Sequence, residues 1–352
     1  MNGVSVGTEA APISRSASSD DALVVLDRRA ALLGVAAFAV AAALPAKAGG
    51  QTMQKMAQTP SLNIGYEETG PASGDPIFLL HGWPYDPRSF DEVVGPLAES
   101  GHRVIVPYLR CFGPTVYRSP EIFRSGQQSA LGRDIVELMD ALNIQKAILA
   151  GFDWGNRAAC AVAALWPERV RAFVSVHGYT ILDIPALSKQ PGDAVALRQT
   201  WYRWFMNAPN GPAILAAERD DIARQCWEAW SPKWRFEDSF FQQSAKSFRN
   251  PDWVDTSIHC YRYWYGNAES DPTVQQFEEK LWRRPKISAP TLTLAPDSDP
   301  LFPVSFSADQ RTLYTSHYER RVLEGVGHDV PKEKPAAFVQ AVKDLIRVAF
   351  AH

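Results

Sequence analysis

Four short stretches of this sequence carry residues that could act together in catalysis, and each directly follows an apolar run. The stretch "AGFDWGNRAA" contains the frame Gly151-x-Asp153-x-Gly155, in which a carboxylate stands where a serine hydrolase has its serine. An ionised carboxylate on a tight turn can attack carbon and form an ester intermediate. The alternative is that Asp153 only caps the following helix. The other stretches are "LLHGWP" at 79–84, "APDSDPLFP" at 295–303 and "GVGHDVP" at 325–331.

The last two stretches supply a candidate acid and a candidate base. "APDSDPLFP" offers Asp297 or Asp299, and "GVGHDVP" places His328 on a loop after the last apolar run. The chain order is therefore nucleophile, acid and base, with Asp153 beside a helix N-terminus that favours its ionised form. The alternative for His328 is an ordinary surface histidine.

Short apolar runs alternating with helical patterns predict how these stretches are held. This alternation is typical of an α/β fold with a mostly parallel sheet flanked by helices. The interval 179–285 breaks the pattern, because it has few β-like runs, and it predicts an inserted helical domain. Strands are expected at 64–68, 77–80, 103–109, 146–150, 172–176, 291–295 and 320–325, and helices at 134–142, 157–166 and 335–350.

The N-terminal part reads as a targeting segment. Arg28-Arg29 precedes an apolar run at 30–44 and an A-x-A cleavage pattern, and so resembles a twin-arginine export signal. The run is shorter than the ~20 residues that span a bilayer. We therefore expect an exported, periplasmic protein with no stable membrane span after cleavage; an uncleaved anchor or an overlong start are the alternatives. The expected organisation is signal 1–48, linker 49–60, core 61–178 and 286–352, and helical cap 179–285.

Composition excludes several classes of function. The formal net charge of −3 gives no electrostatic case for nucleic-acid binding. The four cysteines have no CxxC spacing, so they indicate neither a zinc site nor a redox motif nor a disulfide framework. The many tryptophans between Trp201 and Trp282 indicate either an aromatic-lined cavity or a well-packed helical core.

Taken together over residues 60–350, the four stretches resemble α/β-hydrolases with an aspartate nucleophile. These are the epoxide hydrolases, haloalkane dehalogenases and fluoroacetate dehalogenases. The resemblance implies the α/β-hydrolase fold with an inserted α-helical cap, and no metal or organic cofactor. It favours Asp299 over Asp297 as the acid. It also implies that the amides of Trp83 and Trp154 form an oxyanion hole.

The same resemblance implies two cap tyrosines that donate a proton to the opening epoxide. "HCYRYW" at 259–264 resembles the segment of the second and offers Tyr261. "TWYRWFMNAP" at 200–209 resembles the segment of the first, where one alignment gives Tyr202 and another gives Trp201. A phenol of pKa near ~10 can donate as an alkoxide forms. The alternative for each is an amphipathic core tyrosine.

Two positions bear on the reaction expected of this site. Haloalkane dehalogenases usually have Asn or Glu after His-Gly, whereas this chain has Trp83. Fluoroacetate dehalogenases grip carboxylate with two arginines, of which only Arg157 is matched here; it could instead form a salt bridge on its helix. We therefore expect an epoxide hydrolase acting on a small, apolar or aryl substrate. The alternatives are a hydrolytic dehalogenase and a non-catalytic binding module, and the sequence does not indicate an oligomeric state.

Overall fold

The computed structural model describes residues 53–190 and 192–351 of the 352-residue chain. The predicted export signal at 1–48 lies outside the described residues. Within those ranges, no helix combines the length and the hydrophobicity that a membrane crossing requires.

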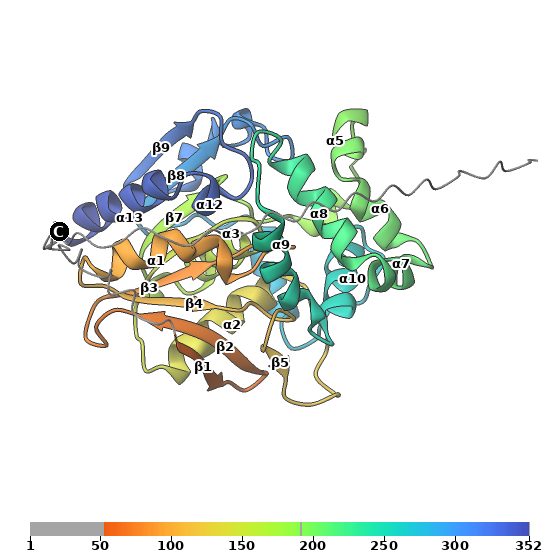
Figure 1. Cartoon of the computed structure of the whole chain (residues 1–352), viewed down its shortest axis with the longest axis horizontal. Helices are drawn as coiled ribbons and strands as arrows, with labels where there is room; N and C mark the ends of the chain where they lie inside the picture. The colour runs from red at the N-terminus through yellow and green to blue at the C-terminus, as the bar shows by residue number, and fades with distance from the viewer. Residues whose placement is uncertain (1–52, 191, 352) are drawn as a thin grey trace, which may run out of the picture. The chain divides into compact units, whose positions relative to one another are not determined.

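A mostly parallel β-sheet organises the described chain, as the sequence predicts (Figure 1). The strands are β1 (Met53–Gln58), β2 (Leu62–Thr69), β3 (Pro76–Leu80), β4 (Arg103–Pro107), β5 (Val116–Tyr117), β6 (Ala147–Gly151), β7 (Val170–Val176), β8 (Thr291–Pro296) and β9 (Tyr318–Leu323). Their order is β1-β2-β4-β3-β6-β7-β8-β9, with β5 paired to β2. β2 is antiparallel to its neighbours, and all pairs from β4 to β9 are parallel. The carboxyl ends of β3, β6, β7 and β8 therefore share one edge of the sheet.

Helices cover both faces of this sheet. The α-helices are α1 (Asp91–Ala98), α2 (Gln128–Ala141), α3 (Asp153–Leu165), α4 (Ile184–Leu187), α5 (Ala194–Gln199), α6 (Trp201–Asn207), α7 (Gly211–Ala217), α8 (Arg219–Trp230), α9 (Asp238–Ala245), α10 (Trp253–Tyr263), α11 (Gln275–Trp282), α12 (Val330–Glu333) and α13 (Pro335–Phe350). Short 3-10 helices are η1 (Pro87–Phe90), η2 (Pro167–Arg169), η3 (Lys246–Arg249), η4 (Val304–Ser307) and η5 (Gln310–Leu313). α13 packs on β7, β8 and α1, whereas α3 packs on β3, β6, β7 and α2 (Figure 1).

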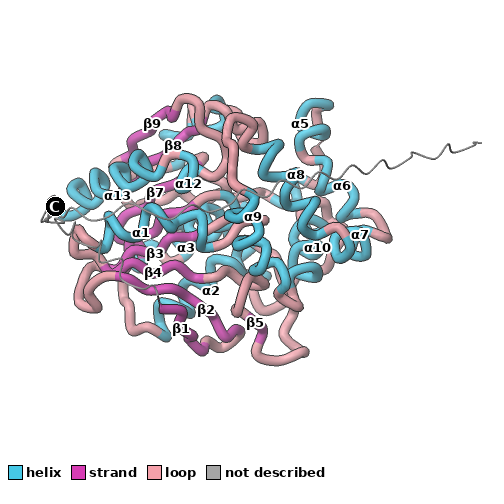
Figure 2. The backbone as a smooth tube through the Cα atoms, in the orientation of Figure 1, coloured by secondary structure: helices cyan, strands magenta, loops and turns pink. Residues whose placement is uncertain are grey.

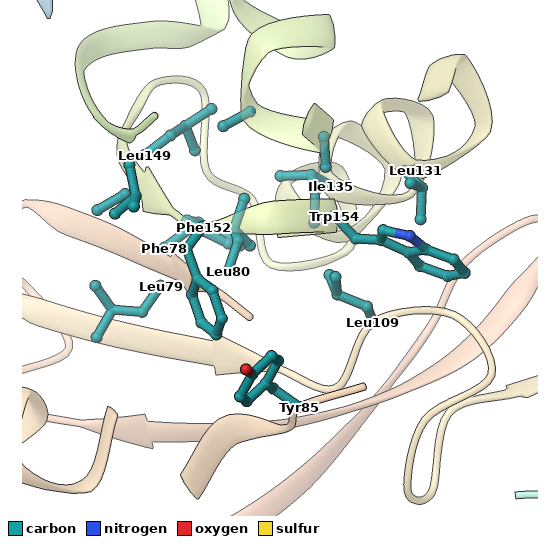
Figure 3. Packing of buried hydrophobic residues seen from close by; sticks show 14 of the residues in the cluster. Phe78, Leu79, Leu80, Tyr85, Leu109, Leu131, Ile135, Leu149, Phe152 and Trp154 are labelled. Atoms are coloured by element: carbon teal, nitrogen blue, oxygen red, sulfur yellow. The ribbon is translucent and has the colours of Figure 1, made fainter. Parts of the chain in front are cut away.

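The central strands are apolar along their whole length because they are buried between the helix layers. Phe78 and Leu80 of β3 and Leu149 of β6 have no exposed surface, and Phe152 and Trp154 after β6 join the same core (Figure 3). The turn that carries Asp153 is thus anchored by large buried side chains on either side of it.

In chain order, helices α4 to α11 come between β7 and β8, the interval for which the sequence predicts a helical insertion. Figure 2 shows α5, α6, α7, α8 and α10 together, to the right of the strands. Four of the insertion's tryptophans are buried, and three of them, Trp227, Trp230 and Trp253, lie near aromatic residues that follow β3. Trp227 stacks on Tyr85 with ring centroids 4.8 Å apart, and Trp253 stacks on Trp83 at 5.8 Å. These tryptophans therefore pack the insertion against the sequence that follows β3.

The predicted linker at 49–60 is wrong for residues 53–58, which form β1. This strand pairs antiparallel with β2 at the edge of the sheet. Its side chains alternate, with Gln54, Met56 and Gln58 exposed while Ala57 is buried. An edge strand has one neighbour and keeps polar residues, so it lacks the apolar run by which the central strands are recognised.

Candidate active site

Asp153 occupies a strained turn between β6 and α3. Its φ is +48°, in the left-handed region that residues with a side chain rarely adopt. A Cβ on Gly155 would lie 2.1 Å from the backbone oxygen of Leu80, and one on Gly151 would lie 2.8 Å from the same atom. The absence of side chains at the two glycines therefore allows the backbone of the turn to approach β3 closely. The helix begins at Asp153 itself and not near Asn156, where the sequence places its start.

The amide of Trp83 holds the Asp153 carboxylate in place. Trp83 N donates to Asp153 Oδ1 at 2.8 Å, and the indole Nε1 of Trp83 donates to Ser257 Oγ at 2.8 Å. A Cβ on Gly82 would lie 2.6 Å from the Cβ of Asp153, so only glycine allows this approach. Burial alone would raise the pKa of Asp153, but His328 and the Trp83 amide outweigh it and lower the pKa. Asp153 is therefore ionised at neutral pH.

His328 lies between the two carboxylates that the sequence singles out. Its Nδ1 is 2.7 Å from Asp299 Oδ2, and its Nε2 is 3.5 Å from Asp153 Oδ2 without an aligned hydrogen bond. Burial opposes the charged ring, yet Asp299 and Asp153 raise the pKa of His328 to about 10. Burial likewise opposes the charge of Asp299, but the neighbouring histidines hold its pKa well below the ordinary value. Of the two candidate acids, Asp299 is thus the one that contacts His328. Asp297 is exposed, and its carboxylate accepts a hydrogen bond from Gly325 N.

A second histidine, His177, shares Asp299 and is absent from the sequence prediction. It follows β7 with a φ of +73°, and its Nε2 lies 2.8 Å from Asp299 Oδ2 without an aligned hydrogen bond. Burial lowers the pKa of His177, against the opposing effect of Asp299, so its ring is neutral. The sequence contains a signal for His177. Like the other candidate residues, it is a polar residue directly after an apolar run, in the stretch "VSVHGY" at 174–179.

His177, Asp299 and His328 also form the one group of potential metal ligands in the described ranges. Both imidazoles approach the same oxygen at 2.7 and 2.8 Å. Zinc needs ligand distances of about 2.0–2.2 Å from separate directions. The arrangement fits two histidines sharing one carboxylate and does not fit a preformed metal site.

The two expected cap tyrosines meet above the Trp83 ring. Tyr202 of α6 and Tyr261 of α10 are buried, and their ring centroids are 5.2 Å apart and 5.5 and 5.3 Å from that of Trp83. Burial raises the pKa of both phenols, and the negative charge of Asp153 raises them further. Both hydroxyls are therefore protonated and can donate hydrogen bonds. Trp201, the alternative to Tyr202, is only partly buried and lines a different part of the insertion.

Two cavities are lined by residues that lie near His328 and the cap tyrosines. One of about 910 Å³ is lined by Trp201, Trp230 and Pro300, and the Trp230 ring lies 5.0 Å from that of His328. Another of about 440 Å³ is lined by residues that include Arg157. Neither is lined by Asp153, whose exposed fraction is 8%. The tryptophan-rich insertion thus supplies both a packed core and an aromatic cavity wall.

Arg157 lies one turn after Asp153 on α3, but forms no ion pair on its helix. It donates from Nη1 to the backbone oxygen of Thr180, and its guanidinium stacks on Trp264 with its central carbon 4.5 Å from the ring centroid. The salt bridge considered as an alternative is therefore wrong for the described residues. The indole Nε1 of Trp154 is buried and has no hydrogen-bond partner in the described ranges.

Residues 75–335 match the family described as alpha/beta hydrolase fold. A solved structure of a proposed epoxide hydrolase from Klebsiella pneumoniae subsp. pneumoniae is 43% identical, with a TM-score of 0.81 over 84% of this chain and 97% of that chain.

Two curated relatives are more distant. Epoxide hydrolase A of Mycobacterium tuberculosis is 22% identical over 333 residues, which cover 84% of this chain and 98% of the relative. A haloalkane dehalogenase of Mycolicibacterium paratuberculosis is 27% identical over 201 residues, which cover 56% of this chain and 63% of the relative. Relatives of both catalytic kinds therefore share the fold.

Proposed function

This chain belongs to the α/β-hydrolase fold family, and from that premise we propose that it hydrolyses epoxides to vicinal diols through an ester on Asp153. Its epoxide hydrolase and dehalogenase relatives make it a hydrolytic enzyme. The observation that carries the proposal is an ionised Asp153 whose Oδ2 lies 3.5 Å from His328 Nε2 and whose Oδ1 accepts from the amide of Trp83, the residue against whose ring the phenols of Tyr202 and Tyr261 pack. Ring opening requires an attacking carboxylate and a proton donor for the ring oxygen.

In the first half-reaction, Asp153 Oδ2 attacks an epoxide carbon and the ring C–O bond breaks. The electron pair moves to the ring oxygen, which takes a proton from Tyr261 or Tyr202. This leaves an alkyl ester on Asp153, a phenolate and a protonated His328. Transfer of the His328 proton to the phenolate then leaves a neutral imidazole beside the ester.

In the second half-reaction, His328 Nε2 removes a proton from water as the water oxygen attacks the ester carbonyl carbon. The amides of Trp83 and Trp154 stabilise the tetrahedral oxyanion, each by about 3–4 kcal/mol as in other oxyanion holes. Collapse expels the diol oxygen, which takes the proton from His328. The new carboxylic acid of Asp153 then protonates His328 and restores the ion pair of the resting enzyme.

One observation favours a dehalogenase as the second candidate. The indole Nε1 of Trp154, next to Asp153, is buried without a partner in the described ranges and could donate to a departing halide. The indole of Trp83 is already bonded to Ser257, which leaves fewer free donors for this role.

The proposal is tested with the variant His328→Gln, which should complete the first half-reaction but not the second. Incubation with styrene oxide should add the mass of one whole epoxide to the intact protein, and the double variant with Asp153→Ala should show no addition. His317→Gln, at an exposed histidine, is the control and should turn over without accumulating an adduct. An adduct of an organohalide less hydrogen halide would instead identify a dehalogenase. A folded His328→Gln protein that forms no adduct would overturn the proposal.

A further inference from the structure

The side chain of Trp230 lies beside the proposed catalytic groups, but no step of the proposed reaction uses it. Trp230 is the last residue of α8, and its exposed fraction is 1%. Its ring centroid is 5.0 Å from that of His328, 5.2 Å from that of Tyr202 and 6.3 Å from that of Trp83. These three residues supply the base, a proton donor and an amide of the proposed oxyanion hole. The indole therefore forms part of the wall around the space in which the epoxide would react.

Backbone contacts hold the end of α8 against the loop that carries His328. The residue after Trp230 is Ser231, whose Oγ accepts from His328 N at 3.0 Å and donates to Glu333 Oε1 at 2.6 Å. A Cβ on Gly327 would lie 2.6 Å from the Cα of Ser231, so the two segments are in close contact. The backbone of Trp230 is thus fixed next to the catalytic base. An opening at this point requires movement or removal of the Trp230 side chain.

The same side chain lines the cavity of about 910 Å³, which lies within the size range of small-molecule sites. The other lining residues include Ala194 and Val195 of α5 and Pro300, which directly follows Asp299 in the chain. Among the described residues that line this cavity, none is a proposed catalytic group. Trp230 therefore stands between the catalytic groups and a space large enough to hold a further part of a substrate.

Hydrogen bonding does not fix the Trp230 ring within the described ranges. Its Nε1 is buried and has no partner there, whereas Nε1 of Trp227, one turn earlier on α8, donates to Pro84 O at 2.8 Å. A buried donor without a partner is costly. Replacing Trp230 with a smaller apolar residue therefore removes part of the wall without leaving a polar partner unpaired.

We propose that Trp230 limits the size of the substrate, so that the enzyme prefers epoxides with a single-ring substituent over those with a second ring in line. This inference rests on the proposed function. The indole separates the cavity from the space around Asp153, and a smaller side chain would join the two. A longer substituent would then lie in the cavity and bury apolar surface against its walls, which favours binding.

The matched substrates are styrene oxide and 4-phenylstyrene oxide, which share the oxirane and differ by one distal ring. The wild-type enzyme should have the higher kcat/KM for styrene oxide. In Trp230→Ala the ratio of kcat/KM for the larger to the smaller epoxide should rise by at least about 10-fold, the lower end of what one small apolar group is worth in a pocket. Trp230→Phe, which keeps one ring, should give a smaller rise. Trp204→Ala, at an exposed tryptophan of the insertion, should leave the ratio unchanged.

Turnover of styrene oxide shows that each variant is folded. Three results would overturn the inference and leave the proposed function standing: a wild-type enzyme that does not prefer styrene oxide, an unchanged ratio in the active Trp230 variants, or loss of both activities in both Trp230 variants. A wild-type enzyme that forms no ester with either epoxide would overturn the proposed function itself.

Discussion

Replacing Asp299 with Asn should stop the second half-reaction while leaving the first intact. Asp299 Oδ1 accepts from Leu301 N at 2.7 Å, and Oδ2 faces His328 Nδ1 at 2.7 Å. If the Asn oxygen keeps the bond from Leu301, its NH₂ group takes the place of Oδ2. His328 Nδ1 must then accept a hydrogen bond, and the ring proton moves to Nε2. A protonated Nε2 cannot take a proton from water.

The size of the effect can be worked from the electrostatics of His328. Its pKa of about 10, against an ordinary value of 6.5, corresponds to roughly 5 kcal/mol of net stabilisation of the charged ring, which remains after burial has opposed the effect of the two carboxylates. Asn has the shape of Asp299 but no charge. The substitution therefore removes the contribution of Asp299 to the stabilisation of the charged His328 ring. We expect turnover to fall by about 10³- to 10⁴-fold, comparable to the loss when the buried aspartate of a serine protease triad becomes Asn.

The assay mixes enzyme with styrene oxide and follows diol release together with intact protein mass. Asp299→Asn should accumulate the ester at close to the wild-type rate and release diol very slowly. Asp297→Asn is the matched control, because among the described residues the carboxylate of this exposed residue hydrogen-bonds only with Ser298 and Gly325, and it should change turnover less than about 3-fold. Turnover of Asp299→Asn within 10-fold of wild type, or loss of turnover without ester, would refute the reasoning.

Three other outcomes are expected. Tyr202→Phe and Tyr261→Phe should each slow ester formation by about 10²-fold or more, as seen by rapid quench, without slowing hydrolysis of ester already formed. Gly155→Ala should lower the free energy of unfolding by at least about 1–3 kcal/mol in denaturant melts, because its Cβ would lie 2.1 Å from a backbone oxygen of β3; Gly95→Ala, with open space around it, should not. In a Gram-negative host, the chain should be recovered from the periplasm without residues 1–48, and changing both twin arginines to lysine should keep it in the cytoplasm.

Much of the fold is predictable because burial between two helix layers leaves a strong pattern. The runs that became β3, β6, β7 and β8 are almost wholly apolar, and α13 occupies the predicted range 335–350. Two strands, β1 and β5, were not predicted. β1 is a polar edge strand, and the two-residue β5 is too short to leave a pattern.

The sequence also predicts some residues of the site better than others. Asp153, Asp299 and His328 each follow a strand of one parallel sheet, so chain order alone indicates that they meet. The meeting of Tyr202 and Tyr261 could not be found in this way, because it depends on how α6 and α10 pack against each other. The sequence left Tyr202 and Trp201 as alternatives for the same reason. A shift of one residue turns a helix by about 100°, and only packing settles which side chain faces inward.

The pKa of His328 poses a question that the proposed ester resolves. A ring with a pKa of about 10 is charged at neutral pH and cannot act as a base. However, Asp153 contributes to that pKa, and formation of the ester removes its charge. The pKa of His328 must then fall, so the neutral base appears when the second half-reaction needs it.

In single-turnover experiments, ester hydrolysis should therefore speed up with rising pH and level off at a pKa clearly below 10. Ester formation should not change over the same range, because Asp153 is already ionised. A hydrolysis step that levels off only near pH 10 would show that the charge of Asp153 does not control His328.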